Sequence, residues 1–245
     1  MPYSAWRCLP TAFPDNAEPN TTLVCLTLMP RSLLPLLALG LLASFVQLLL
    51  LDIVFEKLGL QHDLVYLLLA MVVGGSVINL PLYEVAAEEA PSEDAFQQQI
   101  QRMFSSPRPV FNGRTIIAVN VGGALIPVGF AIYLLHYNAL DLLQVLSAVV
   151  VVAGVAYLTS MPIPKVGVAM PFLVAPLTAA LAAMLINPPM AAPLAYIAGS
   201  VGVLIGADLL RLRVIPKLGA PVASIGGAGP FDGIFLSGLF AVLLV

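Results

Sequence analysis

The run that decides the fold is LLPLLALGLLASFVQLLLL, residues 33–51, which is apolar almost throughout. A helix needs about 20 predominantly apolar residues to cross a hydrocarbon layer about 30 Å thick. The runs at 64–82 and 116–135 have the same length and character. They are too long for ordinary core strands, which usually have about 3–10 residues. Each run is therefore predicted to be a membrane-spanning helix.

The composition of the whole chain agrees with these runs. Hydrophobic residues make up 60% of the 245 positions and charged residues 9%, whereas about 25% of residues are charged in a soluble domain. The net charge of -3 is small, and a nucleic-acid surface would need Lys and Arg clustered on one face. We therefore predict an integral membrane protein with the lipid bilayer as its surroundings and no nucleic-acid partner.

Hydropathy and loop breaks predict seven spans, and the basic residues orient them. The spans lie near 33–52, 64–83, 115–136, 141–160, 167–186, 192–211 and 219–245. With the N-terminus in the cytoplasm, only Lys57 lies outside, and the other nine basic residues lie inside: Arg7, Arg31, Arg102, Arg108, Arg114, Lys165, Arg211, Arg213 and Lys217. The predicted fold class is an all-α polytopic bundle, N-in and C-out.

Two segments lie outside the spans. Residues 1–30 are predicted to be a poorly ordered extension, which lacks the pattern of a signal peptide and makes Met29 an alternative start. Its Cys8 and Cys25 have no metal-ligand spacing. Residues 31–245 form the predicted transmembrane domain.

The stretch 84–114 is the sizeable hydrophilic loop of that domain and is predicted to be cytoplasmic. Within it Ser92 can cap a short helix, and Phe96, Ile100 and Phe104 share one face of that helix. We interpret it as an amphipathic helix at the membrane surface, with a partner-docking helix as the alternative.

Two asparagines interrupt otherwise apolar spans. Asn79 lies beside Gly74, Gly75 and Pro81, and Asn120 precedes Gly122, Gly123 and Pro127. Small residues let helix backbones approach closely, which is the simpler interpretation. The alternative is that the breaks unwind both helices, so that freed carbonyls and the two amides line a polar cavity.

Asp208 and Asp232 are the two acidic residues that hydropathy places in the membrane. A carboxylate at the bilayer centre costs about 2.5–3.5 kcal/mol on insertion scales, so such residues tend to face the bundle interior and mark a functional site. Arg211 lies one helical turn after Asp208, so an ion pair between them is an alternative. No basic residue follows Asp232.

The segment before Asp232 is poor helix material. Gly226, Gly227 and Gly229 precede Pro230, and proline is favoured at the first position of a helix. A helix of about 16 residues from there to the last residue measures roughly 24 Å, short of a core about 30 Å thick. We predict a broken or short last helix that places Asp232 at the depth of Asp208. A continuous helix would separate the two carboxylates.

Aspartyl hydrolysis requires two carboxyl groups at one depth beside water, because one acts as the acid and the other activates water. The same pair could bind a proton or cation. The candidate catalytic residues are Asp208 and Asp232, and the candidate substrate-binding residues are Asn79, Asn120, Ser224, Gly226, Gly227 and Gly229. No cofactor or metal motif is present in the sequence.

Five short runs of the chain form a recognisable series in this order: FEKLGL at 55–60, GSVINLP at 75–81, NVGGALIP at 120–127, GADLL at 206–210 and SIGGAGPFDGIF at 224–235. With these runs the chain resembles a family of bacterial and archaeal membrane proteins, domain of unknown function 1614. The likeness covers roughly residues 35–245 and implies a multi-pass protein of the cytoplasmic membrane, without an established activity.

The chain also resembles, more weakly, the presenilin and signal-peptide-peptidase group of intramembrane aspartyl proteases. That group has one aspartate in span six and one in span seven within Gly-x-Gly-Asp, and Asp208 and Asp232 fall on the corresponding spans. Here Pro230 and Phe231 separate the glycines from Asp232, and no Tyr precedes Asp208. The resemblance implies hydrolysis of a membrane-embedded peptide.

The sequence is therefore compatible with three functions. The first is an intramembrane di-aspartate site of the aspartyl-protease type, and the alternative is a small-solute or ion transporter lined by Asn79, Asn120, Asp208 and Asp232. The third is a non-catalytic scaffold that forms homo-oligomers or other complexes through its glycine-rich faces. A shared cavity for the two carboxylates favours hydrolysis or proton handling, and burial of Asp208 against Arg211 favours a purely structural role for Asp208.

Overall fold

The computed structural model describes residues 42, 49, 51–87, 113–163, 167–218 and 222–245. The predictions for the extension 1–30, for most of the first span and for the amphipathic helix that begins after Ser92 lie outside the described residues. The chain clusters into two compact units, 1–44 and 45–245. Everything below concerns the second unit.

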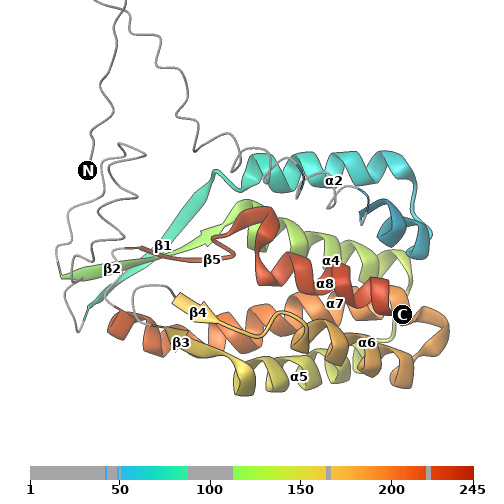
Figure 1. Cartoon of the computed structure of the whole chain (residues 1–245). Helices are drawn as coiled ribbons and strands as arrows, with labels where there is room; N and C mark the ends of the chain where they lie inside the picture. The colour runs from blue at the N-terminus through green and yellow to red at the C-terminus, as the bar shows by residue number, and fades with distance from the viewer. Residues whose placement is uncertain (1–41, 43–48, 50, 88–112, 164–166, 219–221) are drawn as a thin grey trace, which may run out of the picture. The chain divides into compact units, whose positions relative to one another are not determined.

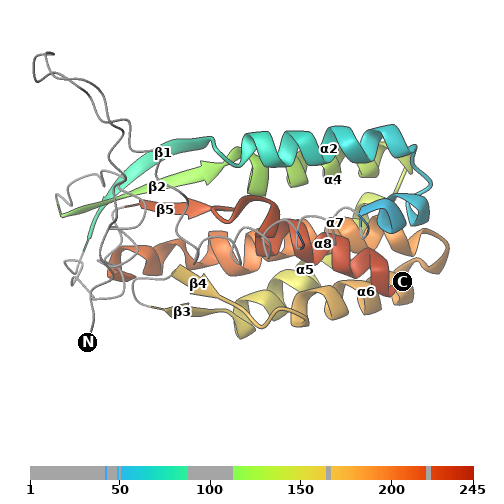
Figure 2. The ribbon, with the colours of Figure 1, turned by 45° about the horizontal axis from the view of Figure 1, so that its top comes forward.

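The second unit is mostly helical and is organised around α7 (Ala191–Val203). Contacts from α7 reach four other helices: α4 (Ile126–Tyr137), α5 (Leu142–Thr159), α6 (Val174–Ile186) and α8 (Gly233–Leu244). Nearly every residue of α7 is buried. Figures 1 and 2 show α7 passing between these neighbours, with α2 (His62–Gly75) alongside α4.

The outer helices bury one stripe and expose apolar side chains on the other. In α5 the buried positions Val145, Ala148, Val149 and Val152 follow the i, i+3, i+4, i+7 spacing of one helix face. The opposite face exposes large apolar residues, among them Leu143, Leu146, Val150 and Leu158. Soluble monomers rarely expose contiguous apolar area on this scale.

Among the described residues, two helices are long and apolar enough to cross a membrane. They are Leu142–Thr159 and the longer run Pro188–Lys217, which joins a short 3-10 turn, α7, a π-helical turn (Leu204–Asp208) and a 3-10 helix (Leu209–Leu218). The helices α2, α6 and α8 have 14, 13 and 12 residues. At 1.5 Å per residue they measure about 18–21 Å, less than the thickness of a hydrocarbon core.

The prediction of an all-α bundle is wrong at the ends of these helices, where the chain forms two sheets. β1 (Asn79–Ala86) follows α2 and pairs antiparallel with β2 (Arg114–Asn120), which leads into α4 through the π-helical turn Val121–Leu125. β5 (Val222–Ile225) lies parallel to β2 and leads towards α8. In Figures 1 and 2 this sheet extends from the ends of the helices that it joins.

The physical reason is that hydropathy does not distinguish a helix from an apolar strand. The β2 stretch contains β-branched Thr115, Ile116, Ile117 and Val119, residue types that favour strands, and Pro81 cannot continue α2. The predicted fifth span likewise starts late. Its first residues form β4 (Gly167–Ala169), which pairs with β3 (Met161–Ile163) in a hairpin, and α6 begins only at Val174.

The predicted break in the last helix is present. After β5 the chain makes a turn at Gly226 and a 3-10 turn over Gly229–Phe231, and α8 begins at Gly233 with Asp232 as its N-cap. The alternative of a continuous helix through this region is therefore wrong. α8 starts three residues later than a helix beginning at Pro230 would, because the proline lies in the 3-10 turn.

Candidate active site

Asp208 is the last residue of the π-helical turn Leu204–Asp208. This turn packs on α5 through Gly206, where a Cβ atom would lie 2.2 Å from the Ala153 carbonyl oxygen. A Cβ atom at Gly202, one turn earlier, would lie 2.7 Å from the Val152 side chain. π-helical turns recur at functional sites because they shift the direction of the side chains around them. The two glycines let the helix approach α5 closely, which determines where Asp208 points.

Arg211 does not neutralise Asp208. Its guanidinium group lies 4.3 Å from the centroid of the Tyr157 ring and donates to the Tyr157 carbonyl at 2.6 Å. It also donates to the Ser160 carbonyl at 2.9 Å and to the Ser160 hydroxyl at 3.1 Å. Within the described part of the chain, Asp208 forms neither a hydrogen bond nor an ion pair. The alternative of an Asp208–Arg211 pair is therefore not realised.

Asp232 is held by the backbone around it. One carboxylate oxygen accepts from the Ile234 N–H at 3.0 Å, as an N-cap does, and the other accepts from the Ala228 N–H at 3.3 Å. An anion is also favoured at the N-terminal end of a helix by the helix dipole. The break before α8 therefore supplies both the position and the orientation of this carboxylate.

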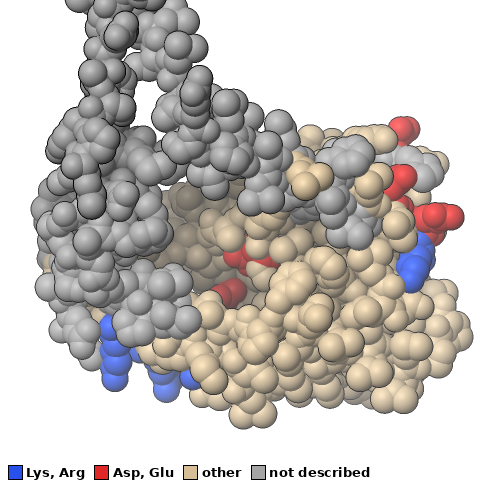
Figure 3. All heavy atoms as spheres, in the orientation of Figure 1, with Lys and Arg blue, Asp and Glu red and all other residues tan. Residues whose placement is uncertain are grey.

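The two carboxyl groups line one cavity of about 260 Å³ and are close enough to interact electrostatically. This volume is enough for several water molecules. In Figure 3 acidic atoms lie inside a hollow of the described surface, apart from the basic atoms in that view. The rest of the described lining is apolar except for Ser237 and comprises Val168, Met170, Phe172, Val203, Ala207, Phe231, Gly233 and Leu236.

The predicted substrate-binding residues Asn79, Asn120 and Ser224 lie together elsewhere. Asn79 accepts a hydrogen bond from the Ser224 hydroxyl at 2.6 Å and one from the Asn120 amide at 3.1 Å. Asn120 also donates to the Ser76 carbonyl at 2.7 Å and accepts from the Gly123 N–H at 2.8 Å. These bonds tie β1, β2 and β5 together where the strands meet the helices, and none of the three residues lines the di-aspartate cavity.

The predicted glycines shape the segment that leads to Asp232. Gly226 and Gly229 have φ of 72° and 61°, a conformation that favours glycine. The Gly226 carbonyl lies 2.0 Å from where a Cβ of Gly123 would stand, and a Cβ on Gly229 would lie 2.6 Å from that of Ser76. The third glycine, Gly227, closes the turn by donating its backbone N–H to the Ser224 carbonyl. The glycine-rich segment is thus packed against the neighbouring helix ends, and it positions Asp232 without lining the cavity.

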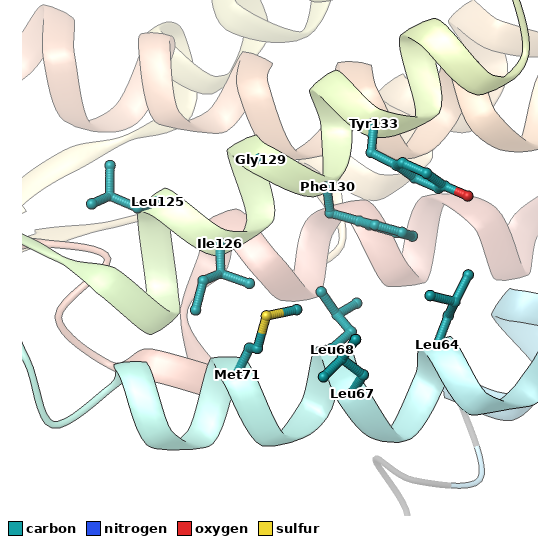
Figure 4. A pocket seen from close by; sticks show the side chains of 9 residues that line it. All are labelled: Leu64, Leu67, Leu68, Met71, Leu125, Ile126, Gly129, Phe130 and Tyr133. Atoms are coloured by element: carbon teal, nitrogen blue, oxygen red, sulfur yellow. The ribbon is translucent and has the colours of Figure 1, made fainter.

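A second cavity, of about 390 Å³, lies between α2 and α4 (Figure 4). Its labelled side chains are apolar apart from the phenol of Tyr133, and Leu68 and Met71 of α2 lie across it from Ile126 and Phe130 of α4. No carboxylate, imidazole or thiol is among these residues. The cavity therefore has no group that could act as an acid, a base or a nucleophile near neutral pH.

Comparison with known proteins gives the family. A family model described as "Protein of unknown function (DUF1614)" matches residues 73–244, which include every element from the end of α2 to α8. The chain belongs to this family. A search of curated proteins and a search of solved structures found no significant match. The DUF1614 match covers both aspartates, the hydrogen-bonded cluster around Asn120 and the glycine-rich segment.

Sequence reasoning missed one polar residue of the cavity in this DUF1614 chain. Ser237 lines the cavity beside Asp232 and Gly233. It is the single polar residue between Gly233 and Leu244, and this isolation is the signal that could have drawn attention to it. Met170 and Phe172 were also missed, because the segment from β4 to the start of α6, which brings them to the cavity, was predicted as the beginning of a helical span.

Proposed function

We propose that this protein is a membrane-embedded aspartyl hydrolase that cleaves a peptide segment within the bilayer. The observation that carries the proposal is that Asp208 and Asp232, from two separate elements, line one cavity without a basic partner among the described residues. Carboxylates in apolar surroundings usually mark a functional site. A pair with different surroundings is suited to divide the roles of acid and base.

We also propose that the chain crosses the cytoplasmic membrane of a bacterium or archaeon several times. The exposed apolar faces, the two long apolar helices and the composition support this placement. In a seven-span arrangement, spans two and three would each combine a helix with a strand, α2 with β1 and β2 with α4. The basic residues Arg211, Arg213 and Lys217 then mark the cytoplasmic end of span six.

The two carboxyl groups differ in a way that suits the reaction. Asp232 has both oxygens engaged by backbone N–H groups, so its orientation is set before a substrate arrives. Asp208 has no hydrogen-bond partner among the described residues, so its oxygens are available to water or substrate. Preorganisation of one group and availability of the other are both useful in catalysis.

In the proposed reaction, water in the cavity adds to the carbonyl carbon of a peptide bond. One carboxylate accepts a proton from the water while the water oxygen forms the new C–O bond. The other, protonated carboxyl supplies a proton to the amide nitrogen as the C–N bond breaks. The products are a carboxylic acid and an amine. Transfer of a proton from the first carboxyl group to the second then restores the starting state.

The transporter alternative receives less support from the geometry. In that reading Asn79 and Asn120 line a polar path together with the aspartates. The Asn120 amide instead donates to Asn79 and to the Ser76 carbonyl, and its oxygen accepts from Gly123. These polar atoms are occupied within the protein, which leaves the carboxylates as the polar groups of the cavity apart from Ser237.

The test uses a transition-state analogue, because such a compound binds more tightly than substrate and does not require the natural substrate to be known. A membrane-spanning peptide with a hydroxyethylene group and a photoactivatable label is added to the full chain in lipid nanodiscs. We expect labelling of the wild type that falls at least tenfold in Asp208→Asn and in Asp232→Asn. Cleavage of the corresponding amide peptide is followed by mass spectrometry.

Asp141→Asn is the matched control, because Asp141 is exposed and its side chain makes no capping hydrogen bond to α5. It should label like the wild type, and all variants should show the same thermal unfolding midpoint within a few degrees. Labelling that survives in both Asp208→Asn and Asp232→Asn, or that equals labelling by a probe without the hydroxyl group, contradicts the proposal. Solute flux in proteoliposomes that depends on both aspartates, without labelling, would favour the transporter.

A further inference from the structure

Ser237 is a buried residue in the wall of the di-aspartate cavity. It lies on α8, five residues after Asp232, and is 3% exposed. It lines the cavity together with both carboxylates. Within the described residues its hydroxyl makes no hydrogen bond, and the hydroxyl oxygen is not among the fully buried unpartnered atoms. The hydroxyl is therefore accessible from the cavity, where a bound molecule can supply the partner that a polar group in the protein interior usually has.

The other hydroxyl groups on or beside helices of this protein show what the default arrangement is. Serine and threonine in apolar helices usually donate to a carbonyl three or four residues earlier. Five side chains in the described part of the chain do so, at 2.6–3.1 Å: Ser76, Ser147, Thr159, Ser160 and Thr178. Ser237 and the buried Ser200 of α7 do not. Of these two residues Ser237 lines the cavity, so its donor remains available there.

The chemistry of the cavity defines what this donor can recognise. In the proposed reaction one carboxyl group is ionised and only accepts hydrogen bonds, and the proton of the other goes to the amide nitrogen. Apart from Ser237, the other described lining side chains are apolar. A peptide segment that is cleaved in the bilayer must expose a carbonyl that its own helix no longer satisfies. Among the described lining residues, Ser237 is the side-chain donor that could satisfy this carbonyl without taking part in the proposed proton transfers.

We propose that Ser237 is a substrate-binding residue whose hydroxyl group donates a hydrogen bond to a backbone carbonyl of an unwound, membrane-embedded peptide in the di-aspartate cavity. This inference rests on the proposed hydrolase function and adds the group that recognises the substrate backbone. It predicts a preference for peptide segments that unwind easily beside the scissile bond. The side chains Val203, Ala207 and Leu236 supply the apolar surroundings for the substrate.

The experiment titrates two photoactivatable hydroxyethylene peptides against the full chain in nanodiscs. One probe keeps the amide carbonyl that flanks the hydroxyethylene group, and in the other an alkene replaces that amide. In Ser237→Ala we expect the half-saturating concentration of the carbonyl probe to rise roughly three- to tenfold, the value of one hydrogen bond. The half-saturating concentration of the alkene probe should not change in Ser237→Ala. Ser237→Thr keeps a hydroxyl group and should bind the carbonyl probe as the wild type does.

Ser200→Ala is the matched control. Ser200 lies on the facing helix α7, is fully buried and likewise has an unpartnered hydroxyl among the described residues, but it does not line the cavity. It should change neither titration. Since Ser237→Ala removes no hydrogen bond within the protein, its thermal unfolding midpoint should equal that of the wild type or exceed it.

Equal affinity of Ser237→Ala and the wild type for the carbonyl probe overturns the inference. A loss of affinity for both probes, together with a lower unfolding midpoint, also overturns it, because that pattern indicates a packing role. If labelling of the wild type requires both aspartates but not Ser237, the hydrolase proposal stands and this inference alone fails. If labelling does not depend on the aspartates, the hydrolase proposal fails first and this inference falls with it.

Discussion

The close approach of the π-helical turn Leu204–Asp208 to α5 at Gly206 is predicted to be essential for the position of Asp208. A Cβ atom at residue 206 would lie 2.2 Å from the Ala153 carbonyl oxygen and 2.9 Å from the Ala156 Cβ. Ordinary contacts begin at about 3.4 Å, so the two helices must separate locally by roughly 1 Å. Overpacking of this kind typically costs about 1–3 kcal/mol. For a chain of this size such a cost lowers the unfolding midpoint by about 2–12 °C.

Gly154 on α5 provides the matched comparison. A Cβ atom there meets nothing within 4 Å, and the residue lies in the middle of a regular helix. Replacing a helical glycine by alanine in open space stabilises the helix by roughly 0.5–1 kcal/mol. Gly206→Ala and Gly154→Ala are therefore the same chemical change, and they are expected to have opposite effects on stability.

Differential scanning fluorimetry in a mild detergent measures both midpoints, and labelling by the hydroxyethylene probe reports the site. We expect Gly206→Ala to lower both the midpoint and the labelling, because the π-helical turn that carries Asp208 has to move. Gly154→Ala should raise the midpoint slightly and leave labelling unchanged. A neutral or stabilising Gly206→Ala would refute the reasoning, since the contact with Ala153 could not then be as close as the structure has it.

Two further predictions concern the partners of polar residues. Because Arg211 binds the end of α5 and not Asp208, the destabilisations of Asp208→Asn and Arg211→Lys should add to within about 0.5 kcal/mol in a double-mutant cycle; a coupling above about 1 kcal/mol would indicate an ion pair after all. Asn120→Ala removes hydrogen bonds to Asn79, Ser76 and a backbone N–H and should destabilise the protein by at least about 2 kcal/mol in denaturant titrations; a loss below about 0.5 kcal/mol would show that the cluster contributes little.

The features that could be predicted from sequence are those set by local chemistry. The glycine-rich segment and Pro230 cannot extend α8, so the break and the N-terminal location of Asp232 follow from residue types alone. The burial stripe of α5 follows from its periodicity. The strands β1 and β2 could not be predicted in the same way, because their partners are distant in the chain and an apolar run of this length fits a helix equally well.

For the candidate site, too, the sequence identified some residues, whereas their contacts depended on the tertiary structure. Asp208 and Asp232 were identified because a carboxylate in an apolar run is costly wherever its neighbours lie. Whether Asp208 would pair with Arg211 depended on tertiary structure, since the C-terminal end of α5 offers Arg211 the Tyr157 ring and two carbonyls. The same holds for Asn79, Asn120 and Ser224, which bond to one another only because three strands meet at that point.

By itself the sequence determined that this chain has more apolar surface than a soluble fold can bury, that two carboxylates lie in apolar segments and that the last helix begins late. Each of these follows from the chemistry of neighbouring residues. Only the tertiary structure decided that the two carboxylates share a cavity, that Ser237 joins them and that the asparagines hold a sheet together. Those are contacts between segments far apart in the chain, and the packing of helices through glycines such as Gly206 determines them.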